Sequence, residues 1–244
     1  MSEKGKLVNY NFDKFIEELN KIQVDISEKQ LEQFRIYYEM LVEKNKVMNL
    51  TGITEWDEVL EKHFLDSISL IRAVALAKEL KVMDMGTGAG FPGLPLKIAF
   101  PNLQVTLADS LNKRVLFLQE VIDALGLTGI EAIHGRAEDL ARDKQYREQF
   151  DLSVSRAVAN LSTLSEYCLP FVKIGGQFIS YKSGECDEEV AASKSAVFLL
   201  GGKISSIVKF ELGESGRSFI VIDKVSGTSK EYPRKAGTPS KKPL

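Results

Sequence analysis

The stretch DMGTGAGFPG, residues 84–93, decides the fold of this chain. It places four glycines in ten positions, directly after the apolar pair Val82-Met83. Glycine lacks a Cβ atom, so the backbone can turn sharply from a strand into a helix, and a ligand can lie against bare backbone at the helix N-terminus. A phosphate, a dinucleotide and a sulfonium nucleoside would each fit such a turn.

The size and composition of the chain bound the possible classes of protein. The 244 residues are 44% hydrophobic and 27% charged, which suits one α/β domain with an added segment. No stretch approaches the roughly 18 apolar residues that a bilayer span needs, so we expect a cytoplasmic protein without a membrane anchor. The net charge is −2, so nucleic-acid binding would have to come from local basic patches.

The few cysteines and histidines argue against metal chemistry. Cys168 and Cys186 have no metal-ligand or disulfide spacing, and both are expected to be reduced packing residues. His63 and His134 are the only histidines, and neither has a partner at usable spacing. The sequence therefore predicts no metal, and it predicts a packing or supporting role for His63.

Residues 1–60 are expected to form a helical N-terminal segment. Ser27 and Gln30 have the spacing of a capping box, which marks a helix start. The amphipathic face that follows has apolar residues at intervals of three and four: Leu31, Phe34, Tyr38 and Leu41. This segment needs a surface on which to pack.

From residue 80 onward, short apolar runs alternate with helical stretches. The expected strands are VMDM, VTLAD, IEAIH, DLSVS and QFISY, and each precedes a helix, the last from about Glu188 to Leu200. Five such units predict a mostly parallel sheet covered by helices on both faces. Residues 203–212 and 217–225 are joined only by GESG and should close the sheet as an antiparallel hairpin. Residues 61–228 would be this domain, and residues 229–244 an extended basic tail.

The glycine loop discriminates among the three ligand classes. A phosphate loop needs Gly-Lys-Ser/Thr at its end, but Gly93 is followed by leucine. Residues 88–93 satisfy the dinucleotide pattern G-x-G-x-x-G, and Asp109 follows about 20 residues on. Asp84, however, would repel a pyrophosphate and suits an ammonium group, while Asp109 can hold a ribose diol. S-adenosylmethionine has both groups. The alternative is that Asp84 caps the helix and Asp109 merely ends a strand.

Two further strand ends bear on the chemistry. Ala137 and Glu138 follow the third strand and would sit where open α/β sheets bind ligands, although RAED is also a common helix start. The fourth strand ends in Ser155-Arg156-Ala157, where enzymes that methylate amino groups carry an Asn/Asp-Pro-Pro-aromatic turn. Neither cysteine lies at a strand end. These features argue against an exocyclic amine or a cytosine carbon as the nucleophile.

A set of short motifs, in order along the chain, resembles one known family. They are NLTGIT at 49–54, KHFLDS at 62–67, DMGTGAGFPGLPL, the RAED and SRA turns, Lys182 after the fifth strand, and YPRKAGTPSKKPL. The set is similar to the bacterial glucose-inhibited division protein B family, the guanine-N7 methyltransferases of 16S ribosomal RNA (methyltransferase G). Ser183 and Ala236 depart from that pattern, where glycine and proline would be usual, which bears on local loop geometry.

The resemblance implies a Rossmann-like class I methyltransferase that moves a methyl group from S-adenosylmethionine to N7 of a guanine in the small ribosomal subunit. Guanine N7 carries a free lone pair, so no general base is required. By resemblance the cofactor would be bound by Gly86, Gly88, Phe91, Asp109, Ala137, Glu138 and Arg156. Arg156 would contact the cofactor or a target phosphate, and its alternative is a surface ion pair. Asn49 and Lys182 would contact RNA, and their alternatives are a helix cap and a solvated lysine.

Two rival functions remain open at this point. One is a dehydrogenase of the dinucleotide-binding class, and the other is a ribosome-binding factor without catalysis.

The C-terminal tail carries a prediction of its own, because residues 230–244 hold five cationic residues against Glu231 alone, a net charge of +4. Prolines should keep this segment extended, so it is expected to follow a phosphate backbone.

Overall fold

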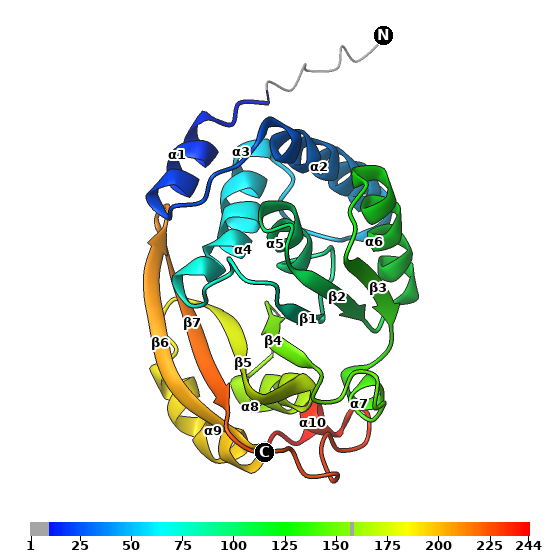
Figure 1. Cartoon of the computed structure of the whole chain (residues 1–244), viewed down its shortest axis with the longest axis vertical. Coiled ribbons are helices and arrows are strands. Elements are labelled where there is room, and N and C mark those ends of the chain that lie inside the picture. The colour runs from blue at the N-terminus through cyan, green and yellow to red at the C-terminus, as the bar shows by residue number, and fades with distance from the viewer. Residues whose placement is uncertain (1–9, 157–158) are drawn as a thin grey trace.

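The computed structural model describes residues 10–156 and 159–244, which form a seven-stranded sheet flanked by helices (Figure 1). The strands are β1 (Lys81–Met85), β2 (Gln104–Asp109), β3 (Ile130–His134), β4 (Phe150–Ser155), β5 (Val172–Ser183), β6 (Gly202–Leu212) and β7 (Ser215–Lys224). Their order is β3-β2-β1-β4-β5-β7-β6. The first five are parallel, whereas β7 runs antiparallel to both β5 and β6. The predicted parallel sheet with a closing hairpin is confirmed.

The strand order reverses between β1 and β4, and this reversal sets the position of the site. Crossovers from β1 lead outward through β2 to β3, while those from β4 lead the other way. Open α/β sheets bind ligands at the carboxyl ends of the strands beside such a reversal. Met85 is paired with Ala108 and Asp109 with His134, so the ends of β1, β2 and β3 lie at the same edge.

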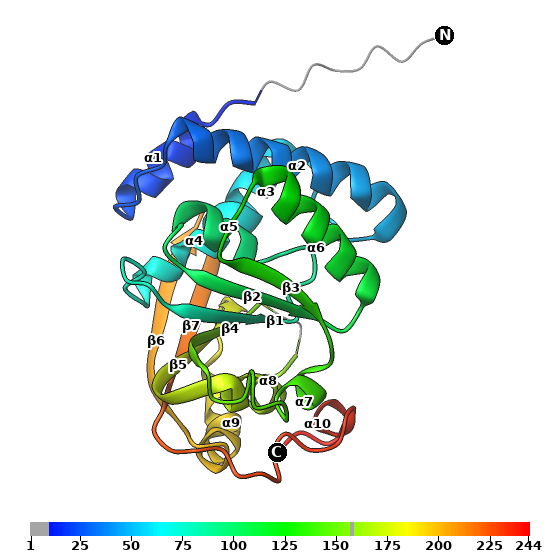
Figure 2. The same ribbon diagram turned by 45° about the vertical axis from the view of Figure 1, so that its right-hand side comes forward.

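Helices cover both faces of the sheet (Figure 2). On one face lie α5 (Gly93–Ala99), α6 (Asn112–Leu125) and, packed across both, α2 (Glu28–Met48). On the other lie α8 (Leu161–Cys168) and α9 (Asp187–Leu199), with the short α7 (Ala137–Leu140) beside α8. The sequence predicts α9 from about Glu188 to Leu200, and in the structure this helix begins and ends one residue earlier.

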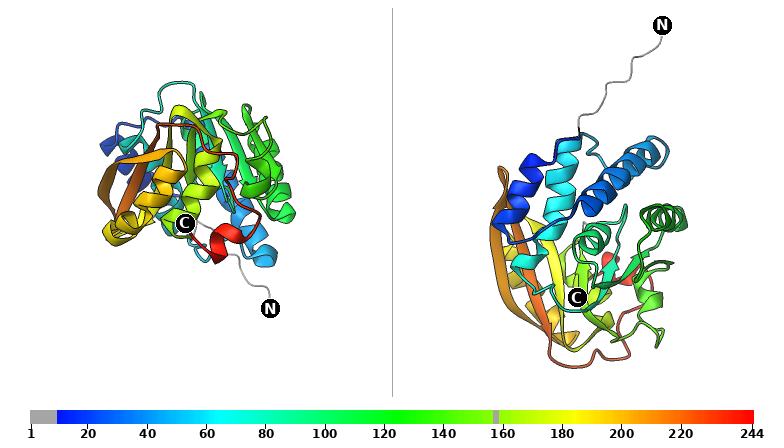
Figure 3. Two further views of the ribbon diagram at one scale, coloured as in Figure 1. Left: turned by 90° about the horizontal axis from the view of Figure 1, so that it is seen from below. Right: turned by 45° about the horizontal axis from the view of Figure 1, so that its top comes forward.

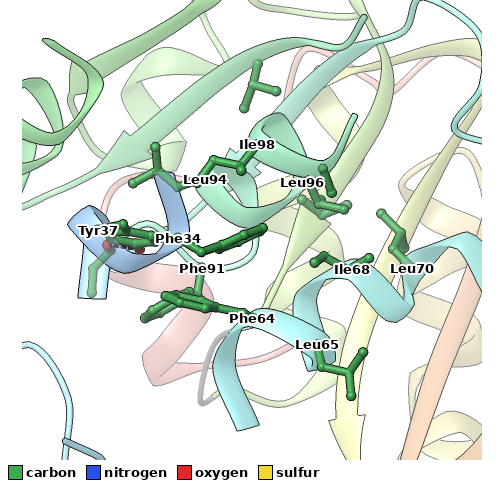
Figure 4. Packing of buried hydrophobic residues seen from close by; sticks show 14 of the residues in the cluster. Phe34, Tyr37, Phe64, Leu65, Ile68, Leu70, Phe91, Leu94, Leu96 and Ile98 are labelled. Atoms are coloured by element: carbon green, nitrogen blue, oxygen red, sulfur yellow. Dashed lines mark hydrogen bonds between the residues drawn. The ribbon is translucent and has the colours of Figure 1, made fainter. Parts of the chain in front are cut away.

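The N-terminal segment shares its hydrophobic core with the sheet domain. Of residues 1–60 the structure describes 10–60, which contain α1 (Asp13–Lys21), α2 and α3 (Trp56–Val59). The π-helical segment η1 (Leu60–Leu65), α4 (Asp66–Ile68) and the 3-10 turn η2 (Ser69–Arg72) then lead into the sheet domain. The predicted capping box at Ser27 is present. Figure 4 shows Tyr37, Phe64 and Phe91 packed together, and the ring centroids of Tyr37 and Phe64 lie 5.3 Å apart. The Tyr37 hydroxyl also donates to the Ala89 carbonyl (2.6 Å), so α2 braces the glycine loop directly.

The C-terminal segment, residues 229–244, does not extend from the domain as the sequence predicts. After β7 the chain runs along the side of the molecule to a short helix, α10 (Thr238–Lys241), which the view from below in Figure 3 shows against the body of the protein. Arg147 donates to the Tyr232 carbonyl (3.0 Å) and Arg142 to the Pro233 carbonyl (2.6 Å). These two arginines hold the segment against the domain by donating to its backbone.

Candidate functional site

The glycine loop between β1 and α5 is fixed from beneath by Asp84. Its Oδ2 atom accepts hydrogen bonds from the Thr87 hydroxyl (2.6 Å) and from the backbone N–H of Gly93 (2.8 Å). A Cβ atom on residue 93 would lie 2.8 Å from this oxygen, so only glycine fits there. Asp84 is completely buried, and burial raises the pKa of its carboxyl to about 6.

The position of Asp84 differs from the expected contact with a ligand ammonium. Its side chain lies under the loop, outside the residues that line the neighbouring cleft. The alternative role at the start of the helix is the one seen, because Gly93 is the first residue of α5. The carboxylate therefore shapes the turn by satisfying backbone and side-chain donors that a tight glycine loop leaves unpaired.

Asp109 ties the loop to the end of β2. Its Oδ2 accepts from the N–H of Gly88 (3.0 Å), whose positive φ of 62° suits glycine, and its Oδ1 accepts from the N–H of Leu111 (2.9 Å). Arg114 approaches Oδ2 at 3.3 Å. A carboxylate has about four acceptor positions, so Asp109 retains capacity for a further donor.

A cleft of about 380 Å³ opens at the carboxyl ends of β1, β2 and β3, and we call it the strand-end cleft. Its lining includes Met85, Gly86, Asp109, Ala137, Glu138, Leu164 and Gly237. Four of the predicted cofactor residues are thus brought together: Gly86, Asp109, Ala137 and Glu138. Gly88 acts on the cleft indirectly, through Asp109, while Phe91 and Arg156 lie outside its lining.

Glu138 lies in the first turn of α7 and is buried at the cleft wall. Its Oε1 accepts a hydrogen bond from the backbone N–H of Gly237 (2.8 Å), a residue 99 positions further along the chain. Among the described residues no donor reaches its Oε2. Two carboxylates, Asp109 and Glu138, therefore line one cleft with acceptor capacity to spare, which suits hydroxyl or amino donors on a ligand.

A second cavity, of about 290 Å³, is lined by Arg156, the residue that follows β4, and we call it the basic cavity. Its lining includes the titratable side chains of Lys62, His63, Asp66, Arg156, Tyr181, Lys182 and Arg217. Ser155 lines the strand-end cleft and the next residue, Arg156, lines the basic cavity. Lys182 donates from the basic cavity to the carbonyl of Ala159 (3.0 Å), which lines the strand-end cleft. The two cavities therefore meet at the end of β4.

Arg156 is held in the basic cavity by contacts that the sequence alone does not reveal. It donates to Asp66 Oδ2 (2.9 Å), and Arg217 donates to Asp66 Oδ1 (2.9 Å). The guanidinium carbon of Arg156 lies 4.8 Å from the centre of the Phe91 ring, a cation–π arrangement. The alternative reading as a surface ion pair does not describe it, because Asp66 is buried and Arg156 is only 19% exposed.

His63 connects Arg156 to the loop that follows α2. Its Nδ1 lies 3.3 Å from Nη2 of Arg156, and its Nε2 lies 2.7 Å from the Thr51 hydroxyl. Nδ1 also lies 3.1 Å from the carbonyl oxygen of Lys62. Burial, and after it the Arg156 charge, lowers the pKa of the imidazole to about 3, so the ring is neutral. The ring also stacks on Phe91, with centroids 4.5 Å apart.

The sequence predicts a packing or supporting role for His63 but does not identify its partners. In the structure the ring packs on Phe91 and contacts Thr51 and Arg156. The KHFLDS motif contained a signal, because His63 and Asp66 are three positions apart and lie on the same side of a helical turn. Nothing in the sequence indicated that Arg156, some 90 residues later, would meet that side.

Of the two residues predicted to contact RNA, Lys182 lines the basic cavity and Asn49 does not. Asn49 is the C-cap of α2, with a left-handed φ of 50°, and its side chain is exposed. The following residues are held by Asn45, whose Oδ1 accepts from the N–H of Thr51 (2.9 Å). Lys182 is half-buried in the basic cavity and pairs with Glu189 at 2.7 Å. Asn49 thus has the capping geometry of its alternative, whereas Lys182 is not a simple solvated lysine.

Other chemistries find no support in the described part of the chain. Within residues 10–156 and 159–244, no group of three His, Cys, Asp or Glu side chains could hold a metal ion. No helix there combines the length and apolar composition of a membrane span. Cys168 and Cys186 are buried, and burial raises the pKa of both thiols, so neither has the character of an activated nucleophile.

Comparison with known proteins gives a consistent family match. The model of the family described as rRNA small subunit methyltransferase G matches residues 30–219. Ribosomal RNA small subunit methyltransferase G of Lachnoclostridium phytofermentans is 53% identical over 232 residues, covering 94% of this chain and 96% of the relative. The protein of the same name from an Exiguobacterium species is 51% identical over 236 residues, covering 96% and 99%.

Solved structures with low sequence identity share the fold. A SAM-dependent methyltransferase from Aquifex aeolicus superposes with a TM-score of 0.51 at 19% identity, covering 68% of this chain and 92% of that one. TrmN from Thermus thermophilus superposes with a TM-score of 0.52 at 17% identity, covering 68% and 53%. The predicted Rossmann-like methyltransferase fold is confirmed by these likenesses together with the sheet topology.

Proposed function

The chain belongs to the rRNA small subunit methyltransferase G family, and we propose that it transfers a methyl group from S-adenosylmethionine to N7 of a guanine in 16S ribosomal RNA. The observation that carries this proposal is the pair of cavities that meet at the end of β4. One has the carboxylates of Asp109 and Glu138 in its lining, beside Arg114 and Arg136, and these carboxylates would accept from a diol and an amine. The other is lined by four cationic side chains and Asp66, and its cations would contact a phosphate. The family match gives no support to the dehydrogenase alternative.

The strand-end cleft suits the cofactor by its donor and acceptor chemistry. Asp109 would accept from the ribose hydroxyls and Glu138 from a donor on the adenine side, while Gly86 leaves backbone open to the ligand. Met85, Ala137 and Leu164 supply the apolar surface that a purine ring needs. A volume of about 380 Å³ falls in the range of small-molecule sites. When bound, S-adenosylmethionine supplies the electrophilic methyl group.

The basic cavity suits the RNA side of the reaction. Arg156, Arg217, Lys62 and Lys182 bring positive charge to it, which would hold a phosphate beside the target nucleotide. Asp66 offsets the charge of the two arginines through direct ion pairs. This offset is useful because a guanine gains positive charge as its N7 is methylated, and unpaired cations against the ring would oppose the reaction.

The described residues around these cavities leave alignment as the main catalytic contribution. N7 presents a lone pair in the plane of the base, so no proton has to be removed before attack. His63 does not act as a base in this scheme, because both of its ring nitrogens already have partners. Holding two reactants in line can lower a barrier by about 7–11 kcal/mol in favourable cases. Phe91 and His63 would contribute by fixing the Arg156 side chain in the basic cavity.

The reaction is tested by incubating the protein with methyl-labelled S-adenosylmethionine and small ribosomal subunits from cells that lack this enzyme. We expect label in 16S RNA as alkali-labile N7-methylguanosine, consistent with a cytoplasmic protein that acts on the ribosome. Naked 16S RNA in parallel identifies the preferred substrate. Label on a carbon atom or an exocyclic amine would contradict the lone-pair mechanism. Absence of label with both substrates would contradict the proposed function.

A further inference from the structure

The C-terminal segment is anchored by an ion pair that is buried on one side. The carboxylate of Glu166, in α8, is fully buried and accepts from the backbone N–H of Arg234 (2.7 Å), from its Nε (2.9 Å) and from its Nη2 (2.7 Å). Arg234 also donates to the carbonyl of Lys242 (2.8 Å), which closes the segment into a loop. A buried charge left without a partner is costly, so detachment of this segment would be strongly opposed.

A second anchor lies at α10. The Thr163 hydroxyl, also in α8, donates to the carbonyl of Pro239 (3.1 Å), and both residues are buried. Leu244, at the chain end, packs against the same hydrophobic cluster as Leu164. Between the two anchors lies Gly237, which is therefore held in a fixed position against the domain.

Gly237 is placed at the strand-end cleft by these anchors. It lines the cleft, and its N–H is the donor that holds Oε1 of Glu138 at 2.8 Å. Its φ of 80° is a left-handed conformation that favours glycine, and a Cβ atom there would meet nothing within 4 Å. The backbone geometry at this position thus serves to aim an N–H at Glu138.

We propose that the C-terminal segment completes the cofactor site. The N–H of Gly237 positions the Glu138 carboxylate. The Arg234–Glu166 ion pair and the hydrogen bond from Thr163 to Pro239 hold the segment in place. This inference rests on the proposed use of S-adenosylmethionine in the strand-end cleft. Gly237 engages Oε1 and leaves Oε2 for the ligand. The segment is a positioning element of the cofactor site, which is a different role from a free arm that contacts only RNA.

The energetic reason is the fixed orientation of a carboxylate. Without the Gly237 N–H, the Glu138 side chain loses a charge-assisted hydrogen bond and gains rotamer freedom, which must be lost again when a ligand binds. One hydrogen bond to a charged group corresponds to roughly ten- to hundredfold in affinity. We therefore expect removal of the segment to weaken cofactor binding by at least about tenfold.

The test measures binding of S-adenosylmethionine by titration calorimetry. One variant ends after Tyr232 and carries Glu166→Gln, which avoids leaving a buried charge unpaired. A second is full-length Gly237→Ala, which adds backbone strain of about 1–2 kcal/mol without a steric clash. The matched control is Lys230→Ala, an exposed change in the same segment. Circular dichroism establishes that each variant is folded.

We expect the dissociation constant to rise by about tenfold or more in the truncated variant, to rise severalfold in Gly237→Ala and to stay unchanged in Lys230→Ala. In the full chain, cofactor should also slow amide hydrogen exchange over residues 233–239. If the truncated variant does not fold, Gly237→Ala and the exchange experiment decide. A folded truncated variant with unchanged affinity overturns the inference, as does unchanged affinity in Gly237→Ala together with unaltered exchange.

These outcomes are distinct from failure of the proposed function. If the full chain does not bind S-adenosylmethionine, the cofactor assignment itself is wrong. If the full chain binds it and the truncated variant binds it equally well, only the role of the C-terminal segment is wrong. Asp109→Asn serves as a reference, since it changes the cleft at a residue outside the segment.

Discussion

Asp66 and Arg156 form an ion pair with a distance of 2.9 Å, and this pair lies in the basic cavity beside the strand-end cleft. The contact joins α4 to the end of β4, two parts of the chain that are 90 residues apart. Arg156 therefore lines the same cavity as Lys62, Lys182 and Arg217. Of the two roles implied by the family resemblance, contact with a target phosphate fits this position better than contact with the cofactor.

Arg156→Ala should reduce methyl transfer while leaving cofactor affinity nearly unchanged. The reason is that its guanidinium lies in the basic cavity, where it would contact RNA. Loss of one charged contact corresponds to roughly tenfold or more in RNA affinity or rate. Steady-state kinetics with small subunits and calorimetry with cofactor provide the two measurements. Weaker cofactor binding with an unchanged KM for RNA would return Arg156 to the cofactor site.

Asp109→Asn should give the opposite pattern, with weaker S-adenosylmethionine binding and unchanged RNA binding. An amide replaces one acceptor oxygen by a donor, which disrupts acceptance from the ribose hydroxyls and from the N–H groups of Gly88 and Leu111. Because these internal bonds are also weakened, we expect a loss of about 1–3 kcal/mol in the free energy of unfolding. Calorimetry and urea unfolding measure the two effects. Unchanged affinity in the folded variant would remove Asp109 from the site.

His63→Phe should lower the rate of methyl transfer by about fivefold, the equivalent of about 1 kcal/mol for lost hydrogen bonding. The substituted ring can still stack on Phe91 but cannot bond to Thr51 or Arg156. Because the His63 pKa is lowered to about 3, wild type and variant should have the same pH–rate profile between pH 5 and 8. An inflection near pH 6.5 that the variant lacks would show that the imidazole titrates in that range.

Lys224 should make the stability of the protein depend on pH in the alkaline range. Its side chain is buried, donates to the carbonyl of Leu169 (2.6 Å) and to the Thr228 hydroxyl (2.7 Å), and has its pKa lowered by burial from 10.5 to about 8. Between about pH 8 and pH 10.5 the Lys224 side chain is protonated in the unfolded chain and neutral in the folded one. The unfolded chain then binds more protons, so the contribution of Lys224 to the free energy of unfolding rises with pH.

The corresponding measurement compares urea unfolding of wild type and Lys224→Met from pH 7.5 to 10.5. The free energy of unfolding of wild type should gain about 3 kcal/mol over the variant across this window, because each pKa unit corresponds to about 1.4 kcal/mol. Far-ultraviolet circular dichroism follows both proteins. Parallel curves for the two proteins would mean that the Lys224 pKa is not lowered.

Lys241→Ala combined with Lys242→Ala should flatten the salt dependence of RNA binding. Both side chains are exposed at the end of the docked C-terminal segment, near the residues that reach the strand-end cleft. Each neutralised phosphate contributes about 0.7 to 0.9 to the slope of log affinity against log salt concentration. Filter binding of 16S RNA at several salt concentrations measures the slope. An unchanged slope would show that these two lysines do not contact phosphate, whatever the cofactor affinity.

The sequence by itself determined the sheet and the strand-end cleft. The alternation of apolar runs with helical stretches predicted the parallel order, and the four-residue GESG connection predicted the closing hairpin, because both signals arise from neighbours in the chain. Asp109 and Glu138 were predicted at strand ends, and the parallel register brings such ends to one edge of the sheet. Local sequence patterns are enough to predict this part of the fold because it repeats one strand–helix unit.

Only the tertiary structure decided the surroundings of Arg156 and the course of the C-terminal segment. Asp66, His63 and Phe91 meet Arg156 from distant parts of the chain, and Glu166 meets Arg234 across 68 residues. The charge and proline content of residues 229–244 predicted an extended arm, because composition carries no information about contacts between this segment and the rest of the domain. A fully buried carboxylate on α8 requires a partner, and this requirement, which no local pattern records, brings the segment back to the domain.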